Sequence, residues 1–221
     1  MSIIPHYFNS ELFFNFVKSS ELSLVYINFF IALIYEKKES LFLSMLIIFS
    51  STINYFLKHV ISVPIFNMFG DYIPIFGQGS RPLGASDCGY FNNCPKKLST
   101  SFGFPSGHSQ FAGLNSGFLI RDIIYKNTKD GKFSSLKKKD KMSVILLLLF
   151  IPIMMYSRVY IEKCHTLEQT IFGATIGLIL GYKSHDLYLY INKNYNNVIN
   201  LQSSKKKLMM FIIFFYLTFC K

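Results

Sequence analysis

Apolar stretches separated by short polar connections run along almost the whole chain. A bilayer crossing needs roughly 20 residues of helix, and runs near that length predict membrane helices at about 22–35, 41–57, 109–125, 142–156, 166–182 and 208–220. The first and last runs are short for a crossing, and we expect the first to extend upstream. The pattern predicts an all-α fold, a polytopic membrane helical bundle of about six transmembrane helices.

Two stretches depart from this pattern of simple crossings. Residues 60–76 are apolar but contain Pro64, Gly70 and Pro74, so we interpret them as re-entrant or interfacial. Residues 77–108 form the longest polar segment between spans and are expected to carry the functional site. We predict a single membrane-embedded domain over 1–221, which comprises an N-terminal segment 1–21, a motif-bearing core at about 41–182, and a basic loop and C-terminal apolar helix over 183–221.

Composition supports a membrane protein. The chain is 51% hydrophobic and 17% aromatic, with 16% charged residues and a mean hydropathy of +0.32, which excludes an ordinary soluble domain. The net charge of +11 could suggest nucleic acid, but the lysines lie in short loops between apolar spans. We therefore expect no nucleic-acid partner and explain the lysines by the positive-inside rule.

The lysines also orient the predicted helices. Alternating spans place the lysine-rich connections 36–40, 126–141 and 183–207 on one side, which is cytoplasmic by the positive-inside rule. The opposite, lumenal or external side then receives five side chains from distant segments: Lys58, Arg81, His108, Arg158 and His165. This convergence predicts a functional site at that face.

A glycine repeat marks the span at 166–182. Gly173, Gly177 and Gly181 recur at four-residue spacing, which places them on one face of a helix. Small residues at this spacing allow two membrane helices to approach closely, so we expect this face to be closely packed.

The cysteines carry a weaker expectation. Cys88 and Cys94 lie in the polar segment, where a disulfide could join them, and Cys164 could instead pair with either or stay free. Their spacing fits no zinc motif, and the lumenal segments have no cluster of carboxylates. We therefore expect no metal and no cofactor.

The motif Phe104-Pro105-Ser106-Gly107-His108-Ser109 lies directly before the span at 109–125. Proline is tolerated in a first helical turn, and the free N–H groups of a helix start bind anions such as phosphate. His108 adds a group that can carry a proton near neutral pH. The motif alone predicts an anion site, or simply a helix cap with an incidental histidine. The other histidines, His6, His59 and His185, are expected to be solvated or interfacial.

The chain has 20 lysines but only three arginines. Arginine makes paired, charge-assisted hydrogen bonds to phosphate oxygens, whereas lysine acts as a point charge. Arg81 and Arg158 lie at predicted lumenal boundaries, where they could hold phosphate or anchor the helices in the membrane. Arg121 lies beside Asp122 near the cytoplasmic end of its span and is most simply an interfacial residue.

Together these segments resemble the three-part signature of the type-2 phosphatidic-acid phosphatase and vanadium haloperoxidase superfamily. The resemblance covers about 41–180 and is carried by Lys58, Arg81-Pro82, Pro105-Ser106-Gly107-His108, and Ser157-Arg158 followed by His165. Two segments, Phe-Pro-Ser-Gly-His-Ser-Gln-Phe and His-Thr-Leu-Glu-Gln, further resemble the dolichyl-diphosphatase branch.

The resemblance implies a division of labour among these residues. His165 would attack phosphorus to form a phosphohistidine, and His108 would protonate the leaving group. Water would then hydrolyse the intermediate without a metal. The phosphate would be held by cationic and helix-start residues: Lys58, Arg81, Ser106, Gly107 and Arg158.

Three departures from the family pattern affect these expectations. Lys58 precedes Arg81 by 23 positions, so the inserted segment would have to loop back for Lys58 to reach the site. One extra residue separates Arg158 from His165. Gln169 stands where the family usually has aspartate, and the dolichyl-diphosphatase branch shares this glutamine. It could orient the nucleophile, Glu168 could assist instead, or Gln169 could simply form a capping box.

We therefore expect a membrane phosphatase that acts at the lumenal face on a lipid phosphate or a polyprenyl (dolichyl) diphosphate. The branch resemblance favours the endoplasmic reticulum or another endomembrane. The alternatives are a phosphatidate-type lipid monoester phosphatase, a glucose-phosphate phosphatase, and an inactive relative that binds lipid phosphate or acts as a scaffold.

Overall fold

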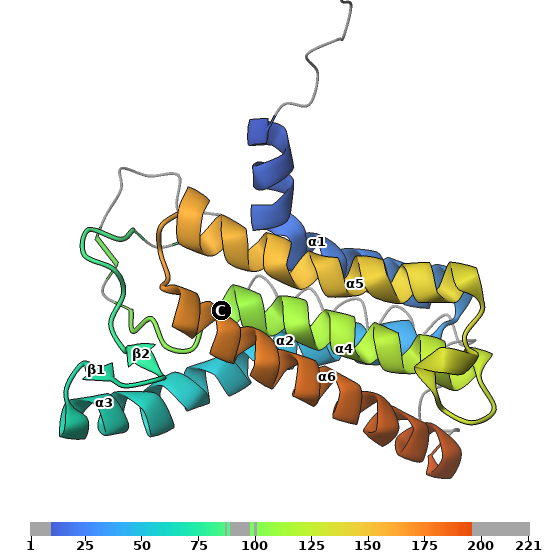
Figure 1. The fold of residues 1–221 in the computed structure, drawn as a ribbon. Helices are drawn as coiled ribbons and strands as arrows, with labels where there is room; N and C mark the ends of the chain where they lie inside the picture. Colours follow the sequence, from blue (N-terminus) through green and yellow to red (C-terminus); the bar gives the residue numbers. More distant parts are fainter. Residues whose placement is uncertain (1–9, 87, 89–97, 100, 196–221) are drawn as a thin grey trace, which may run out of the picture.

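The computed structural model describes residues 10–86, 88, 98–99 and 101–195 (Figure 1). These residues are mostly helical, as expected. The helices are α1 (Ser10–Tyr35), α2 (Lys38–Phe56), α3 (Val63–Phe69), α4 (Gly107–Asn127), α5 (Lys138–Tyr156) and α6 (Leu167–Asn194), with a short 3-10 turn at Phe133–Ser135. An antiparallel hairpin of two short strands, β1 (Tyr72–Ile73) and β2 (Gly77–Gln78), follows α3.

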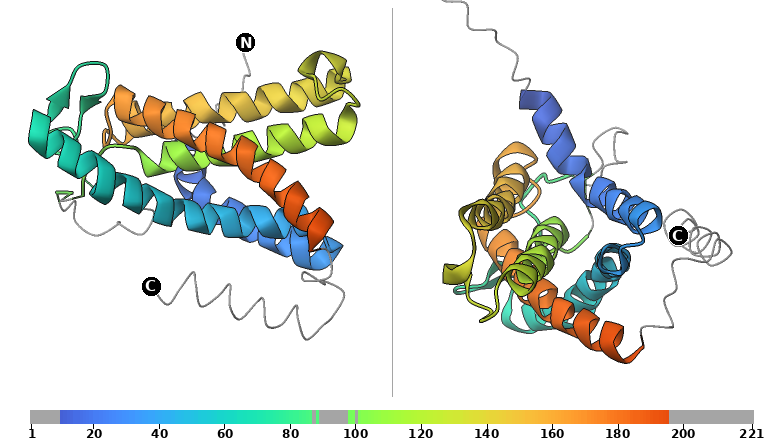
Figure 2. Two further views of the ribbon diagram at one scale, coloured as in Figure 1. Left: turned by 90° about the horizontal axis from the view of Figure 1, so that it is seen from below. Right: turned by 90° about the vertical axis from the view of Figure 1, so that its right-hand side faces the viewer.

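Three helices in the described part of the chain are long and apolar enough to cross a membrane: Val17–Tyr35, Lys38–Phe69 and Lys138–Ile161. Helices also form at the expected positions 109–125 and 166–182, as α4 and α6. Viewed end-on, α4 lies between the other long helices (Figure 2), and most of its residues are buried. A helix that faces protein on most sides need not be strongly apolar. The expected helix at 208–220 lies outside the described residues.

The second apolar span is longer than the sequence suggested. The helix does not end at Lys58-His59, because α2 continues through a π-helical turn at Leu57–Ser62 directly into α3. The combined helix, Lys38–Phe69, has 32 residues and therefore measures about 48 Å. This corrects the interpretation of residues 60–69 as a re-entrant segment. Pro64 lies inside this combined helix, directly after the π-helical turn, where the regular α-helical hydrogen-bond pattern is already interrupted.

The helices α4 and α6 pack closely along the glycine repeat of α6. An added Cβ at Gly177 would collide with the backbone carbonyl of Gln110. The match is reciprocal, since an added Cβ at Gly113 of α4 would collide with the carbonyl of Ala174. The close packing predicted for the face of Gly173, Gly177 and Gly181 is therefore confirmed, and α4 contributes small residues of its own.

The end of the bundle that carries the connection between α4 and α5 is called the far end. Here α6 continues through residues 183–194, which were expected to belong to a loop. His185 is fully buried there rather than solvated, and its Nε2 atom lies 3.1 Å from Oδ1 of Asp122. The ammonium of Lys126 lies 2.9 Å from carboxylate oxygens of both Asp122 and Glu39. These contacts join α2, α4 and α6 at this end.

Arg121 also lies at the far end. Its Nε atom donates a hydrogen bond to Oδ1 of Asp186 at 2.9 Å, and its guanidinium lies 5.3 Å from the ring centre of Tyr182. The described partners of the Arg121 guanidinium are thus residues of α6, and Arg121 lies at the opposite end of the bundle from Arg81 and Arg158.

We predict that Gly177→Ala destabilises the protein by about 1–3 kcal/mol, because the new methyl group meets backbone that cannot move away. The melting temperature of the purified protein in detergent checks this. The control is Thr175→Val on the exposed face of the same helix, which should change the melting temperature little. Equal melting temperatures for both variants would contradict the packing described for α4 and α6.

Candidate active site

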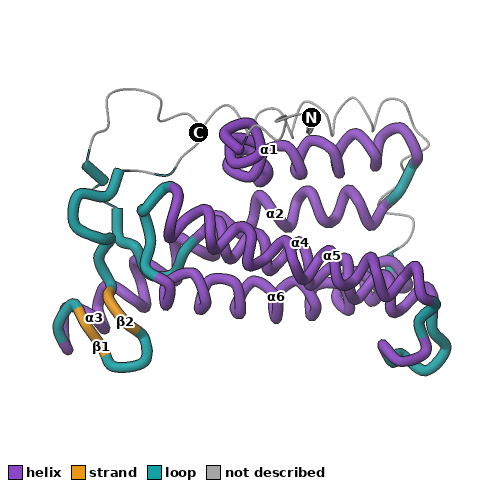
Figure 3. Tube along the Cα trace, turned by 45° about the horizontal axis from the view of Figure 1, so that its top comes forward, coloured by secondary structure: helices purple, strands orange, loops and turns teal. Residues whose placement is uncertain are grey.

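The structure brings the five expected side chains to one end of the bundle. This end carries the hairpin and the connection before α4, opposite the connections between α1 and α2 and between α4 and α5 (Figure 3). Nη1 of Arg81 lies 3.4 Å from Nε2 of His165. The charges of Lys58 and Arg158 act on both His108 and His165. Segments more than a hundred residues apart therefore form one cationic cluster.

Two of its cations lie in π-helical turns. The turn Leu57–Ser62 contains Lys58, and the turn Ser157–Ile161 after α5 contains Arg158. Such turns in a longer helix are rare and frequently mark functional sites. Both apolar helices thus change their backbone geometry where they carry a charged side chain to the site.

The segment between Lys58 and Arg81 does loop back. After α3, the hairpin reverses the chain, and Asp71 fixes its return by accepting hydrogen bonds from the backbone N–H of Ser80 at 2.7 Å and from its hydroxyl at 2.6 Å. Partial burial raises the pKa of Asp71, but these hydrogen bonds outweigh burial and hold the pKa below its ordinary value. The turn therefore delivers Arg81 to the cluster despite the long insertion.

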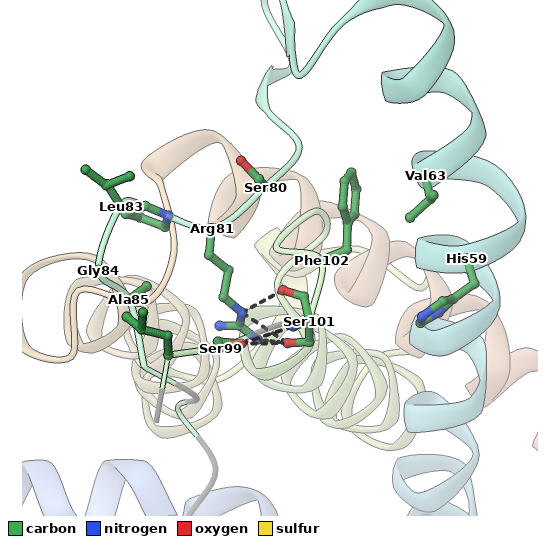
Figure 4. Close-up of a pocket in the computed structure, with 12 residues that line it drawn as sticks. His59, Val63, Ser80, Arg81, Leu83, Gly84, Ala85, Ser99, Ser101 and Phe102 are labelled. Atoms are coloured by element: carbon green, nitrogen blue, oxygen red, sulfur yellow. Dashed lines mark hydrogen bonds between the residues drawn. The ribbon is translucent and has the colours of Figure 1, made fainter. Parts of the chain in front are cut away.

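Arg81 is held mainly by carbonyl and hydroxyl oxygens. Its Nε atom donates to the carbonyl of Ser101 at 3.1 Å, and Nη2 donates to the Ser101 hydroxyl at 2.8 Å (Figure 4). Nη1 donates to the carbonyl of Cys164 at 3.0 Å. These hydrogen bonds fix the guanidinium beside His165 from two directions.

A pocket of about 490 Å³ adjoins Arg81. Its polar lining includes Ser80, Ser99 and Ser101, and His59 lies across from Arg81 (Figure 4). His59 is exposed, as expected, but it stacks on Tyr55 and faces this pocket rather than only solvent. The pocket offers room for a polar group next to the cationic cluster.

Arg158 is fully buried. Nη1 donates to the carbonyl of Cys88 at 3.2 Å and lies 3.3 Å from Oε2 of Glu162, which the sequence analysis did not single out. The Nε atom is buried and has no hydrogen-bond partner in the described part of the chain. A buried donor without a partner is costly, so this N–H is suited to an anionic ligand.

The disulfide joins Cys88 to Cys164, 76 positions apart. This is one of the pairings that the sequence left open, and it replaces the pairing of Cys88 with Cys94, a residue outside the described part. Cys88, Cys164 and His165 form a compact group, but the two sulfurs bind each other and are not thiolate ligands. The disulfide fastens the loop that contacts Arg158 to the residue before His165.

His165 is held by Gln169. The Gln169 amide donates from Nε2 to the carbonyls of Gln78 and Ser80, both at 2.7 Å, which leaves Oε1 facing Nδ1 of His165 at 3.0 Å. Since Oε1 is an acceptor, Nδ1 carries the hydrogen. The Nε2 lone pair then points toward Arg81.

Burial, and after it the charge of Arg81, lowers the pKa of His165 to about 3, while the Gln169 hydrogen bond acts weakly in the opposite direction. The imidazole is therefore neutral at physiological pH. A neutral, oriented imidazole with an unprotonated Nε2 can act as a nucleophile.

Gln169 also forms the expected capping box with Thr166 at the start of α6. The structural and orienting roles considered for Gln169 are therefore compatible. Glu168 lies against Gly77 instead, and it makes no contact with His165 among the residues that the structure describes.

The start of α4 supplies the remaining part of the site. Helix α4 begins at Gly107, after the extended N-cap residue Ser106. The backbone N–H of Ser106 donates to the carbonyl of Gln169 at 3.0 Å, and the Nδ2 atom of Asn54 donates to the carbonyl of Pro105 at 3.3 Å. The hydroxyl of Ser106 is buried without a partner among the described residues. The helix start is thus fixed from α2 and α6.

His108 has an unexpected neighbour. Its Nε2 atom lies 3.7 Å from Oε2 of Glu21 in α1. Glu21 lies in the span Val17–Tyr35, whose other charged residue is Lys18. An ionisable residue within an apolar span is a signal of function that the sequence already contained, but its partner became visible only in the fold.

Comparison with known proteins agrees with this geometry. A search of curated proteins and a search of solved structures found no match. A family model for the PAP2 superfamily matches residues 39–196, which is well over half of the chain and includes Lys58, Arg81, His108, Arg158 and His165. The chain therefore belongs to the PAP2 superfamily.

Proposed function

We propose that this protein is a membrane lipid phosphatase that works through a phosphohistidine intermediate on His165. Membership of the PAP2 superfamily suggests a phosphatase-type function, and the three apolar helices fit a membrane protein. The observation that carries the proposal is the buried His165, whose Nδ1 is held by Gln169 and whose Nε2 faces Arg81.

The phosphate would lie between the start of α4 and the cations. The unpartnered Nε of Arg158 and hydroxyl of Ser106 would donate to its oxygens. The free N–H groups at Gly107, together with Lys58 and Arg81, would stabilise the charge that develops in the transition state.

The reaction has two steps. The Nε2 lone pair of His165 forms a bond to phosphorus, and the bond from phosphorus to the leaving oxygen breaks as that oxygen takes a proton from His108. Neutral His108 then accepts a proton from a water molecule, whose oxygen attacks phosphorus and breaks the bond to Nε2. Phosphate leaves and His108 is protonated again. This chemistry uses no metal and no cofactor.

Two features bear on the substrate. The site lies at the end of apolar helices, which favours a lipid phosphate that reaches it from the membrane. The pocket of about 490 Å³ beside Arg81, which Ser80, Ser99 and Ser101 help to line, has room for a second phosphate group, which favours a polyprenyl (dolichyl) diphosphate over a phosphatidate-type monoester. A glucose-phosphate phosphatase is less favoured because its substrate has no lipid chain.

The proposed location follows from the charges. The far end of the bundle carries the lysine-rich connection that begins at Lys126, so the positive-inside rule assigns that end to the cytoplasm. The active site would then face the lumen of the endoplasmic reticulum or another endomembrane. Unpaired donors in the site argue for a working enzyme rather than an inactive scaffold.

We predict vanadate-sensitive phosphate release that resists chelators when the purified protein is incubated with a lipid phosphate. The assay compares polyprenyl diphosphate, polyprenyl monophosphate, phosphatidate and glucose 6-phosphate, with and without EDTA. His165→Ala should reduce release to background because the nucleophile is absent. If the wild-type protein releases no phosphate from any of these compounds, the proposed function is wrong.

We predict that Arg158→Lys lowers kcat by roughly 100-fold or more, because an ammonium cannot replace the planar fork that binds both protein and phosphate. The matched control is Arg121→Lys at the far end of the bundle, which should keep nearly full activity. Steady-state kinetics on the best substrate of the panel measure both variants. Wild-type rates in Arg158→Lys would contradict its assigned role.

We predict that attack by His165 is insensitive to pH between about 5 and 8. A pKa of about 3 means that the imidazole becomes protonated, and so loses its nucleophilic lone pair, only well below this range. The measurement is kcat/KM for p-nitrophenyl phosphate, whose leaving group needs no proton, corrected for titration of the substrate. An acid limb near pH 6.5 that belongs to the enzyme would show that His165 has an ordinary pKa.

A further inference from the structure

Glu21 is a carboxylate within an apolar helix, directed at the active site. It lies in the span Val17–Tyr35, and its Oε2 atom lies 3.7 Å from Nε2 of His108. Its charge also acts on Arg158. Placing a charged side chain in an apolar span costs free energy, and the partners of Glu21 are residues of the catalytic cluster. Glu21 precedes residues 39–196, the part that the family model matches, so family membership assigns it no role.

The other charges near His108 are of opposite sign to Glu21. They come from every neighbouring element: Lys58 after α2, Arg81 after β2, Arg158 after α5, and His165 when protonated. Burial, and after it these cations, lowers the pKa of His108 and so opposes a proton on its ring. Glu162 is already paired with Arg158. A general acid must carry its proton before the leaving group departs. The cations that suit phosphate binding therefore reduce the fraction of His108 that carries the proton to be donated.

We propose that Glu21 is a positioning residue that holds the catalytic proton on His108 against the surrounding cations. The proposal rests on the proposed function, in which His108 protonates the leaving oxygen. The carboxylate, 3.7 Å from the ring, stabilises the imidazolium form of His108. After His108 has given its proton to the leaving group, the same carboxylate favours its return from the attacking water. Glu21 exchanges no proton and touches no reacting atom.

The ion pair also orients the ring. The backbone just before His108 is fixed independently of this pair, because Asn54 donates to the carbonyl of Pro105 and the N–H of Ser106 donates to the carbonyl of Gln169. The loss of Glu21 should therefore change the protonation and direction of the imidazole more than the fold. A positioning role therefore predicts a changed pH profile with a retained fold, whereas a purely structural role predicts a loss of the fold.

The test is Glu21→Gln, which removes the charge and keeps the shape. Its kcat/KM is measured from pH 5 to 9 on two substrates: the best lipid phosphate of the panel, whose alcohol or phosphate leaves with a proton, and p-nitrophenyl phosphate, whose phenolate leaves without one. The matched control is Glu36→Gln. Glu36 is an exposed carboxylate just beyond the C-terminal end of α1.

We expect Glu21→Gln to lose roughly 10-fold to 100-fold in kcat/KM on the lipid phosphate at pH 7.5, since general acid catalysis contributes about 10²–10⁴-fold. Its alkaline limb should move to lower pH by about one to two units. Activity on p-nitrophenyl phosphate should fall by less than about threefold. Glu36→Gln should match the wild-type protein on both substrates. Combining Glu21→Gln with His108→Ala should cost no more than His108→Ala alone.

Equal losses on both substrates, or an alkaline limb that does not move, would overturn the proposal in favour of a structural role. A wild-type protein without activity would instead overturn the proposed function, which keeps the two failures distinct. If Glu21→Gln does not fold, as judged by its melting temperature, Glu21→Asp decides. Its longer gap to His108 should move the alkaline limb to lower pH by a smaller amount, and an unmoved limb in that variant would overturn the proposal.

Discussion

The backbone contact between α4 and α6 is the constraint on which the rest of the structure depends. Glycines let the two helices approach until a single added Cβ would meet the opposing backbone. Where α4 begins, the carbonyl of Ser106 lies against Gly173, and the N–H of Ser106 donates to the carbonyl of Gln169. The start of α4 is thereby fixed beside the start of α6, where His165 lies. The anion site and the nucleophile are parts of one helix pair.

Several of the hydrogen bonds that position the two arginines of the proposed site go to neutral groups. Arg81 donates to the carbonyls of Ser101 and Cys164, and Arg158 donates to the carbonyl of Cys88. Carbonyl oxygens position a guanidinium without cancelling its charge. The same arrangement keeps His165 unprotonated, because burial and nearby cations both oppose its imidazolium form. A buried amide, Gln169, orients the nucleophile without a second negative charge.

In the proposed mechanism the two histidines have opposite requirements beside the same cations. His165 would have to stay neutral to attack, and the cations favour its neutral form. His108 would have to carry a proton, and the same cations oppose it. The contact at 3.7 Å between His108 and Glu21 places a carboxylate beside one histidine, whereas the described side-chain acceptor beside the other is the Gln169 amide. This asymmetry is a physical basis for assigning the nucleophile and the acid to different residues.

The sequence by itself determined the helices and the candidate chemistry, because apolar runs, the glycine repeat and the scarce arginines are local features. It also placed five distant side chains on one face, since alternating spans follow from helix order. Only the tertiary structure decided the continuation of α2 into α3, the pairing of Cys88 with Cys164, and the partner of Glu21. Each of these depends on which segments meet in space, and π-helical turns and long-range contacts leave no periodic pattern in the chain.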